Sequence, residues 1–546
     1  MTETPPQPWW QKAVFYQIYP RSFKDTTGDG IGDLAGIIQK LDYLKGTPTS
    51  LGIDAIWLSP VYPSPQSDFG YDVSDYCAID PIFGDLSTFR QLLREAHERD
   101  IKVVMDLVVN HTSAEHDWFK ESRTSRENPK QDWYIWRDGS GDAPPNNWHS
   151  VFGGSAWQWD DQRQQYYLHL FLKDQPDLNW RNPAVQEAVW ETMRFWLDLG
   201  VDGFRLDVYN FYFKDAELRS NPKRRSFKGI FYKYASQHHH YDQDQPELYS
   251  TLAKMREIVD SYPSDRMLVG ETSTLEDFRR AFSYYGDENN GLNLVFNFEF
   301  LHSRWRARDF RKAIQHWQTC APEDSWPTWV LSNHDVKRHG SRYSRGSQID
   351  LARAKVAATL LLTLKGAPFL YYGEEIGMLE LALPHHMIQD PPGKKFWPFF
   401  KGRDGCRTPM QWCDEANAGF TDGIPWLPVH ENFKQINVSI AAADDSSLLQ
   451  YYKRLIRLRC ATPTLLAGVM HLIEKVPRNT LIFTRSEAGD ELWIGLNFSH
   501  RKAIVQLNFP ENLEIILATH HAEGATFSHG IMALEPDEAV ICRKIK

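Results

Sequence analysis

Residues 200–207 read GVDGFRLD, a short apolar run that ends in the acidic residue Asp207. Two later runs have the same form: residues 268–271 read LVGE and end in Glu271, and residues 329–335 read WVLSNHD and end in Asp335. Each run is typical of a buried strand that opens into a loop. The intervals from 207 to 271 and from 271 to 335 both span 64 residues, too many for one helix or hairpin. Aligned parallel strands would bring these three ends to one face of a barrel, where the catalytic residues of barrel enzymes lie.

The rest of the chain alternates between apolar runs and segments whose apolar residues recur at helical spacing. Helical spacing is clearest in residues 86–100, 184–200, 248–262 and 351–366. Eight runs are expected to be strands, near residues 13–20, 53–60, 102–111, 200–208, 267–271, 292–300, 328–335 and 366–375. This alternation predicts an α/β fold, a parallel (β/α)8 TIM barrel.

The chain has 546 residues, about twice the length of a plain barrel, so further domains are expected. Residues 111–180 are rich in Trp, Asn, Asp, Gly and Pro, which predicts a subdomain inserted after the third strand. Residues 466–546 contain short strands separated by turns, which predicts a C-terminal antiparallel β-sandwich. The barrel itself is expected to comprise residues 1–110 and 181–465.

Composition restricts the possible partners. The formal net charge is −10, and 61 basic residues are spread among 71 acidic ones, which argues against nucleic acid or an anionic membrane as a partner. We find no run of 18 uncharged apolar residues and no signal-like start, so a soluble protein without a membrane span, cytoplasmic in location, is expected. The six cysteines are dispersed and are expected to be reduced thiols, with a redox pair of Cys406 and Cys413 as the alternative.

Seven motifs carry a family resemblance. In chain order they are AVFYQIYPRSF (13–23), DLVVNHTS (106–113), QPDLNW (175–180), GFRLD (203–207), LVGET (268–272), LSNHD (331–335) and GRDGCRTPMQW (402–412). Together they resemble the α-amylase family of glycoside hydrolases, and most nearly its α-glucosidase and oligo-1,6-glucosidase branch. The resemblance extends from about residue 10 to residue 425. It implies the same three domains that the residue pattern predicts.

The resemblance implies a role for each of the three acids. Asp207 would be the nucleophile and Glu271 the acid/base, a pair that lies about 5 to 5.5 Å apart in retaining glycosidases. Asp335 would bind sugar hydroxyls and stabilise the transition state. Arg205 is expected to keep Asp207 ionised, and the apolar run before Glu271 is expected to raise the pKa of that carboxyl group. Alternatively, the acids could cap helices or pair on the surface.

The resemblance also implies a set of residues that hold the sugar. Asp68, Tyr71, His111, Arg205, His334 and Arg403 match the family positions that grip the terminal glucose. Phe152 and Phe171 are expected to form an apolar wall against the sugar, or else to be ordinary subdomain core. Val208 follows the nucleophile, as in enzymes that resemble oligo-1,6-glucosidases, and favours α-1,6 bonds or broad tolerance.

Polar segments raise further possibilities. Residues 25–33 read DTTGDGIGD, in which the side chains of Asp25, Thr27, Asp29 and Asp33 and the carbonyl of Ile31 could surround a structural Ca²⁺ or Mg²⁺; a solvated acidic turn is the alternative. No organic cofactor is expected. The run Lys223 to Arg225 is interpreted as a solvated face, with a phosphorylated sugar as the alternative ligand. The histidines at 238–240 are interpreted as loop residues rather than a metal site.

Three functions remain open at this point. The first is a retaining exo-acting α-glucosidase on malto- or isomalto-oligosaccharides, or sucrose, working as a monomer or homodimer. The second is a transglucosidase or a sucrose or trehalose isomerase, because water and sugar compete for the same intermediate. The third is a noncatalytic barrel like the heavy subunits of amino-acid transporters. The three acids and the lack of an apolar span argue against the third.

Overall fold

The computed structural model describes residues 7–141, 143–272, 277–287, 290–507 and 512–545, and its centre is a barrel of parallel strands. The strand order is β10-β11-β1-β2-β3-β7-β8-β9, and a parallel bridge between Phe296 and Thr328 joins the two ends of the sheet. The predicted (β/α)8 fold is confirmed, with all eight predicted strands in place. They are β1 (Phe15–Ile18), β2 (Ala55–Leu58), β3 (Lys102–Leu107), β7 (Gly203–Leu206), β8 (Met267–Gly270), β9 (Leu294–Val295), β10 (Thr328–Val330) and β11 (Ala367–Tyr371).

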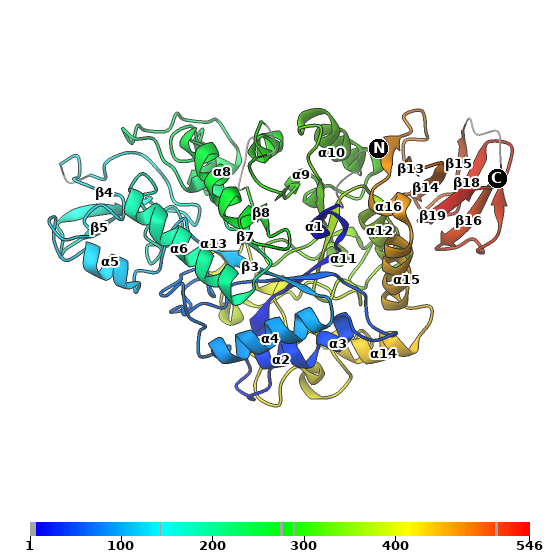
Figure 1. Ribbon diagram of the computed structural model, residues 1–546, viewed down its shortest axis with the longest axis horizontal. Helices are drawn as coiled ribbons and strands as arrows, with labels where there is room; N and C mark the ends of the chain where they lie inside the picture. Colours follow the sequence, from blue (N-terminus) through cyan, green and yellow to red (C-terminus); the bar gives the residue numbers. More distant parts are fainter. Residues whose placement is uncertain (1–6, 142, 273–276, 288–289, 508–511, 546) are drawn as a thin grey trace.

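Helices surround the barrel (Figure 1). The longer ones are α4 (Leu86–Glu98), α6 (Pro183–Leu199), α8 (Glu247–Asp260), α10 (Ala307–Cys320), α12 (Leu351–Thr363) and α15 (Leu448–Ala461). The shorter ones are α1 (Trp9–Lys12), α2 (Leu34–Gln39), α3 (Leu41–Leu44), α5 (Asp117–Ser122), α7 (Lys228–Phe231), α9 (Phe298–Leu301), α11 (His339–Tyr343), α13 (Pro391–Phe396), α14 (Val438–Ala443) and α16 (Pro463–Leu466). Helix α12 is apolar on nearly every side because α15 and the C-terminal sheet cover the face turned away from the barrel.

Helix α6 leads the chain into β7, the strand that carries Asp207. The helix begins where the side chain of Asn182 accepts a hydrogen bond from the Ala184 N–H, with Pro183 in its first turn. It ends at Gly200, whose φ of 108° lies in the left-handed region that glycine tolerates best. These local signals fix where β7 starts, and therefore which residue stands at its end.

Aromatic rings fill the inside of the barrel. Phe15 of β1 stacks on Phe369 of β11 with ring centroids 4.2 Å apart, and Phe296 packs edge-on against Phe369 at 4.9 Å. All three side chains are buried, together with Trp57 of β2. The barrel interior is therefore a packed core, and polar chemistry is left to the strand ends.

A small antiparallel sheet lies in the segment between β3 and α6. Its order is β4-β6-β5, and its strands are β4 (Trp136–Arg137), β5 (Trp157–Asp160) and β6 (Gln165–Leu168). Apolar residues of this segment, among them Trp148 and Leu170, pack in one cluster with Val208 and Phe211, which lie in the turn after β7. The inserted segment therefore contacts the barrel beside Asp207.

The C-terminal strands form an antiparallel domain at the opposite end of the molecule from the inserted sheet (Figure 1). A six-stranded sheet has the order β12-β13-β14-β19-β16-β17, and β15 pairs with β18. Val505 and Met532 of the pair pack on Ile482 and Val540 of the larger sheet. The strands are β12 (Val469–Leu472), β13 (Thr480–Glu487), β14 (Asp490–Asn497), β15 (Ala503–Gln506), β16 (Leu513–Ala518), β17 (Thr526–Phe527), β18 (Ile531–Leu534) and β19 (Ala539–Lys544).

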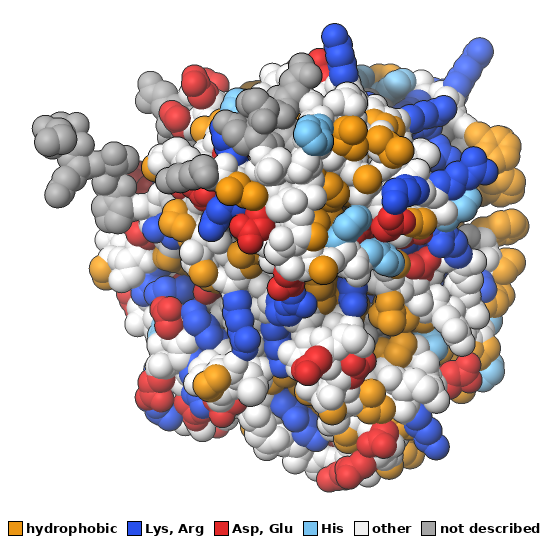
Figure 2. Space-filling model, turned by 90° about the vertical axis from the view of Figure 1, so that its right-hand side faces the viewer, with side chains coloured by type: hydrophobic (Ala, Val, Ile, Leu, Met, Phe, Trp, Pro, Cys, Tyr) orange, Lys and Arg blue, Asp and Glu red, His pale blue; other side chains and the backbone are white. Residues whose placement is uncertain are grey.

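Acidic and basic side chains are interspersed on the surface at the C-terminal end of the molecule, as Figure 2 shows. Among the described residues no helix is both long and apolar enough to cross a membrane. All six cysteines are unpaired, and Cys406 and Cys542 are buried.

Candidate active site

The centre of the site is Arg205, a fully buried arginine on β7. Its Nη1 donates to Oδ1 of Asp106 at 2.6 Å and to Oδ1 of Asp207 at 2.7 Å. Its Nη2 forms an ion pair with Oε2 of Glu271. Asp207 and Glu271 follow the neighbouring strands β7 and β8, whose last residues are paired in register. The two acids predicted to carry the reaction therefore contact the same guanidinium group, Asp207 at Nη1 and Glu271 at Nη2.

The third acid, Asp335, follows β10 and lies among cations. Its Oδ1 accepts hydrogen bonds from Arg403 Nη1 at 3.1 Å and from Arg407 Nη2 at 2.8 Å, and Nε2 of His334 lies 3.3 Å from its Oδ2. Arg403 also donates to Oδ1 of Asp68 at 2.7 Å. Two clusters of ion pairs, one centred on Arg205 and one centred on Arg403, therefore lie at the mouth of the barrel.

The two clusters shift the pKa values of their aspartates in opposite directions. Burial raises the pKa of Asp207 to about 6, and the attraction of Arg205 only partly offsets this effect. We expected Arg205 to keep Asp207 ionised at neutral pH, and a pKa of about 6 still leaves this carboxyl group mainly ionised there, although desolvation outweighs the attraction of Arg205. Burial also opposes ionisation of Asp335, yet His334 and the guanidinium groups of Arg403 and Arg407 hold its pKa well below the usual range.

Two buried histidines are neutral at physiological pH. Burial lowers the pKa of His334 to about 3 and also lowers the pKa of His111. Gln17 Nε2 donates to Nδ1 of His334 at 2.7 Å, which leaves the ring proton on Nε2, 2.7 Å from the hydroxyl of Tyr71. Neutral imidazole rings and a tyrosine hydroxyl suit an uncharged, hydroxyl-rich ligand.

The predicted site residues come together around one cavity of about 200 Å³. Arg205 is the exception: it lies behind the cavity and orients two of the acids that line it. The predicted residues on the lining are Asp68, Tyr71, His111, Phe152, Phe171, Asp207, Val208, Glu271, His334, Asp335 and Arg403.

Aromatic side chains form one wall of this cavity. The rings of Phe152 and Phe171 meet edge to face with centroids 5.6 Å apart. Phe171 also contacts the ring of His111 at 5.2 Å, and the guanidinium carbon of Arg403 lies 5.3 Å from the centre of the Phe152 ring. The inserted segment thus supplies an apolar face opposite the charged strand ends.

Sequence reasoning missed several residues of the site. Gln175 lines the cavity, and its Nε2 donates to Tyr71 O at 3.1 Å and lies 3.1 Å from His111 Nε2. Arg407 is fully buried and holds Asp335. Both residues belong to motifs that define the family resemblance, QPDLNW and GRDGCRTPMQW, so the signal was present. Val151, which also lines the cavity, has no such signal.

Val208 adopts an unusual backbone conformation beside the predicted nucleophile. Its φ of 34° and ψ of 42° lie in the left-handed region, which is unfavourable for a β-branched residue. Its side chain is buried against the inserted segment and also lines the cavity. Packing against the insertion therefore compensates for a strained backbone at the residue that follows Asp207.

Two other polar segments lie outside the cavity lining. Lys223 and Arg225 are exposed, in agreement with a solvated charged face. His239 is buried and pairs with Asp242 at 2.7 Å. Within the described ranges no group of three or more His, Cys, Asp or Glu side chains is placed to hold a metal ion.

The predicted cation loop is held by its own hydrogen bonds. Oδ1 of Asp25 accepts from the N–H groups of Thr27 and Gly28 at 2.8 and 2.9 Å, and its Oδ2 accepts from Thr421 at 2.5 Å. Asp33 caps helix α2, and Asp29 is exposed. The donors are all oxygens, which suits Ca²⁺, but they do not converge into a cage. A structural cation therefore stays a prediction.

Comparison with known proteins places the chain in a family. The family described as alpha amylase, catalytic domain, matches residues 17–468. This chain is an α-amylase family glycoside hydrolase.

The relatives of this α-amylase family enzyme align with it over nearly its whole length. It is 45% identical over 515 residues to a probable alpha-glucosidase of Rhizobium meliloti, with 92% of each chain covered. It is 43% identical to an oligo-1,6-glucosidase of Parageobacillus thermoglucosidasius, with 91% of this chain and 92% of the relative covered. Among solved structures, the alpha-glucosyl transfer enzyme XgtA has a TM-score of 0.93 at 43% identity, covering 99% of this chain and all of its own. A trehalulose synthase, MutB, has a TM-score of 0.90 at 35% identity, covering 98% of this chain and all of its own.

The pKa of Asp207 predicts the acid side of the pH profile. A nucleophile must be ionised, so kcat/KM should fall as the pH drops through about 6, the pKa raised by burial. Initial rates between pH 4 and 8 on an uncharged α-glucoside measure this limb, because kcat/KM reports the free enzyme. A profile that stays flat down to pH 4.5 would contradict the assignment.

The loop at residues 25–33 gives a second prediction. If it binds Ca²⁺ only when folded, free Ca²⁺ at one hundred times its Kd adds about 2.7 kcal/mol to the free energy of unfolding. EDTA should then lower the melting temperature, and excess Ca²⁺ should restore it. Asp29→Ala should abolish this response, whereas Asp161→Ala, at another exposed turn, should not. A melting temperature insensitive to EDTA and Ca²⁺ would argue for the solvated turn.

Proposed function

We propose that this protein is a retaining, exo-acting α-glucosidase that releases glucose from the non-reducing end of short α-glucosides. One observation carries the proposal: Asp207 and Glu271 bind the two arms of the buried Arg205 guanidinium and face the same small cavity as Asp335. Carboxylates held this close together suit a nucleophile and an acid/base on one sugar ring. The names of the relatives support an α-glucosidase.

In the first step Asp207 attacks the anomeric carbon and Glu271 protonates the leaving oxygen. The bond from that carbon to the leaving oxygen breaks, and a covalent glucosyl ester on Asp207 forms. Positive charge develops on the sugar ring, and the carboxylate of Asp335, kept ionised by Arg403 and Arg407, stabilises it.

In the second step Glu271, now a carboxylate, takes a proton from water. The water oxygen bonds to the anomeric carbon, and the ester bond breaks with its electron pair returning to Asp207. Two inversions retain the α configuration. Arg205 stays in contact with both acids and limits how far they can move apart.

We infer exo-action from the small size of the cavity and from the polar pairs on its lining. Asp68 and Arg403 pair on its lining, and Gln175, which also lines it, contacts both Tyr71 and His111. A cavity of about 200 Å³ with these polar contacts suits one terminal sugar ring rather than a continuous chain. We extend the proposal to malto- and isomalto-oligosaccharides and sucrose, with α-1,6 bonds favoured by Val208 and by relatives named oligo-1,6-glucosidase.

A second candidate function is transfer of glucose to another sugar. The structural likeness to an alpha-glucosyl transfer enzyme and to a trehalulose synthase favours keeping it. Both reactions share the ester on Asp207 and differ only in the nucleophile of the second step. A cytoplasmic location and a monomeric or homodimeric state complete the proposal, with the neutral oligosaccharide as partner.

Removing the nucleophile tests the main proposal. Asp207→Asn should lower the rate of glucose release from isomaltose by at least about 10³-fold, because no glucosyl ester can form. The melting temperature should not fall, since the burial that raises the pKa of Asp207 shows that its ionised form destabilises the folded state. The wild type should release α-glucose, as measured by NMR. Release of β-glucose would reject a retaining mechanism.

Product analysis at high sugar concentration separates hydrolysis from transfer. Incubation with maltose, isomaltose, kojibiose, nigerose, trehalose and sucrose should give mainly free glucose, with isomaltose turned over faster than maltose. Isomeric disaccharides as the main products from sucrose would favour the second candidate. Faster turnover of maltose would contradict the linkage assigned from Val208.

A further inference from the structure

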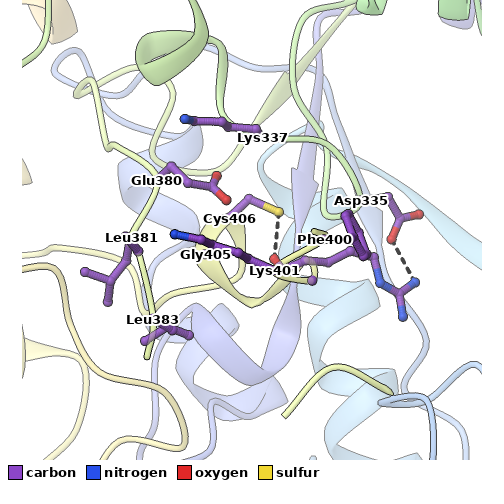
Figure 3. Close-up of a pocket in the computed structure, with 12 residues that line it drawn as sticks. Asp335, Lys337, Glu380, Leu381, Leu383, Phe400, Lys401, Gly405 and Cys406 are labelled. Atoms are coloured by element: carbon purple, nitrogen blue, oxygen red, sulfur yellow. Dashed lines mark hydrogen bonds and ion pairs between the residues drawn. The ribbon is translucent and has the colours of Figure 1, made fainter. Parts of the chain in front are cut away.

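Arg403 reaches the catalytic cavity from the long segment between β11 and α15. Phe400 and Lys401, which precede it, lie beside Asp335 in Figure 3, where the hydrogen bond of 3.1 Å from Arg403 to Asp335 is drawn as a dashed line. The Nη2 group of Arg403 also donates to Oδ1 of Asp68 at 2.7 Å. A long arginine side chain has many rotamers, so its orientation between these two acids depends on further contacts.

Asp390 supplies those contacts. Its Oδ1 accepts a hydrogen bond from Arg403 Nε at 2.8 Å and lies 2.7 Å from Arg403 Nη2. Its Oδ2 accepts from the backbone N–H of Arg403 at 3.1 Å. Asp390 is fully buried. One carboxylate therefore holds both the backbone and one edge of the guanidinium group, and the Nη1 end is left for Asp335.

The same carboxylate closes the loop of residues 390–403. Oδ2 of Asp390 also accepts from the N–H of Gly393 at 3.1 Å and so caps helix α13. In the other direction, Oδ2 of Asp404 accepts from the N–H groups of Gln389 and Asp390 at 2.6 and 2.9 Å. The two ends of the loop are therefore joined through two buried aspartates.

Gly402 allows the two ends of the loop to approach this closely. Its φ of 83° lies in the left-handed region, and a Cβ atom there would lie 2.8 Å from Oδ2 of Asp390 and 3.0 Å from Cα of Gly393. A side chain at residue 402 would therefore push Asp390 away from Arg403. The glycine and the aspartate thus serve the same contact.

The closed loop also contacts the aromatic wall of the catalytic cavity. Lys395 Nζ donates to the carbonyl oxygen of Gly153 at 2.7 Å. Gly153 directly follows Phe152, whose ring centre lies 5.3 Å from the guanidinium carbon of Arg403. The guanidinium group is therefore held at its edge by Asp390 and contacts the Phe152 ring with its face.

We propose that Asp390 is a positioning residue for the terminal sugar: it holds Arg403 in the orientation in which this side chain, together with Asp68 and Asp335, binds one glucose ring. This inference rests on the proposed glucosidase function. Asp390 does not line the catalytic cavity and belongs to none of the seven motifs. The charge of Asp390, and not its helix cap, is the feature that matters, because only the charge pairs with the guanidinium group.

A substitution that preserves the helix cap tests the proposal. Asp390→Asn keeps a capping oxygen but removes the charge that pairs with Arg403. KM for isomaltose should rise about tenfold, which corresponds to about 1.4 kcal/mol. The kcat should change less than about twofold, because Arg407 still holds Asp335 and a contact made equally in the ground and transition states affects only KM.

A purely structural role would give a different result. Partial unfolding lowers the fraction of active protein, and therefore the apparent kcat, but not KM. A KM within about twofold of the wild type would overturn the inference, whatever happens to kcat. Asp390→Ser, which also caps helices, should give the same rise in KM and takes the place of Asp390→Asn if that variant does not fold.

Asp350 supplies a matched control. Its Oδ1 accepts from the N–H of Arg353 at 3.2 Å and so caps helix α12, and its Oδ2 lies 3.6 Å from Arg353 Nε. It does not line the catalytic cavity. Asp350→Asn should therefore leave KM and kcat for isomaltose within about twofold of the wild type. A tenfold rise of KM in this variant as well would remove the specific role of Asp390.

A double-mutant cycle shows whether Asp390 acts through Arg403. Arg403→Gln alone should lower kcat/KM for isomaltose at least about tenfold. Adding Asp390→Asn to this variant should lower kcat/KM by less than about a further twofold, because the side chain that Asp390 positions is already absent. A further tenfold loss would reject the positioning role.

Glucose binding to an inactive protein separates this inference from the proposed function. In an Asp207→Asn background, calorimetry should show that Asp390→Asn weakens the binding of glucose about tenfold. Equal affinities with and without Asp390→Asn would reject the inference while leaving the glucosidase function in place. If the wild type released no glucose from any oligosaccharide, the proposed function would fail instead, whatever the calorimetry shows.

Discussion

The buried guanidinium of Arg205 is the interaction on which the site depends. It contacts Asp106, Asp207 and Glu271 at once, and it stacks above Trp57 of the barrel core, with the guanidinium carbon 5.1 Å from the ring centre. A single cation that binds three carboxylates fixes their relative positions more firmly than backbone geometry alone, because its nitrogens lie in one rigid plane. Loss of the Arg205 guanidinium would leave three buried carboxylates without their shared cation, a cost of several kcal/mol.

Asp207 and Asp335 have different charged surroundings, and this difference suits them to different roles. Asp207 lies in the more carboxylate-rich cluster and has a pKa raised to about 6 by burial, whereas Asp335 lies among arginines and stays ionised. An acid that is poised near neutrality is a more basic, and so more nucleophilic, carboxylate, and a permanently ionised one suits electrostatic stabilisation. The neutral histidines add hydrogen-bond donors without adding charge.

Much of the site could be predicted because each motif sits at a strand end. Once the eight strands are aligned, the residues that follow them must converge, and Asp207, Glu271 and Asp335 do so. The sequence was less informative about residues whose position in the site depends on packing between segments far apart in the chain. Gln175 reaches Tyr71 only because the inserted segment folds over the barrel, and Arg403 reaches Asp335 only through the long segment after β11. The cation expected at the loop of residues 25–33 stays a prediction, because Oδ1 of Asp25 accepts hydrogen bonds from the backbone of the loop itself.

The sequence by itself indicated an eight-stranded barrel and the three acids at strand ends, because hydrophobic periodicity acts locally and aligned parallel strands bring their ends to one face. Only the tertiary structure decided the pKa values of Asp207 and Asp335 and the shape of the catalytic cavity. A pKa depends on the desolvation and charges contributed by every neighbouring element, and Arg403, which pairs with Asp335, lies 68 residues away from it in the chain. The catalytic cavity likewise exists only where segments far apart in the chain meet, a contact that no local pattern encodes.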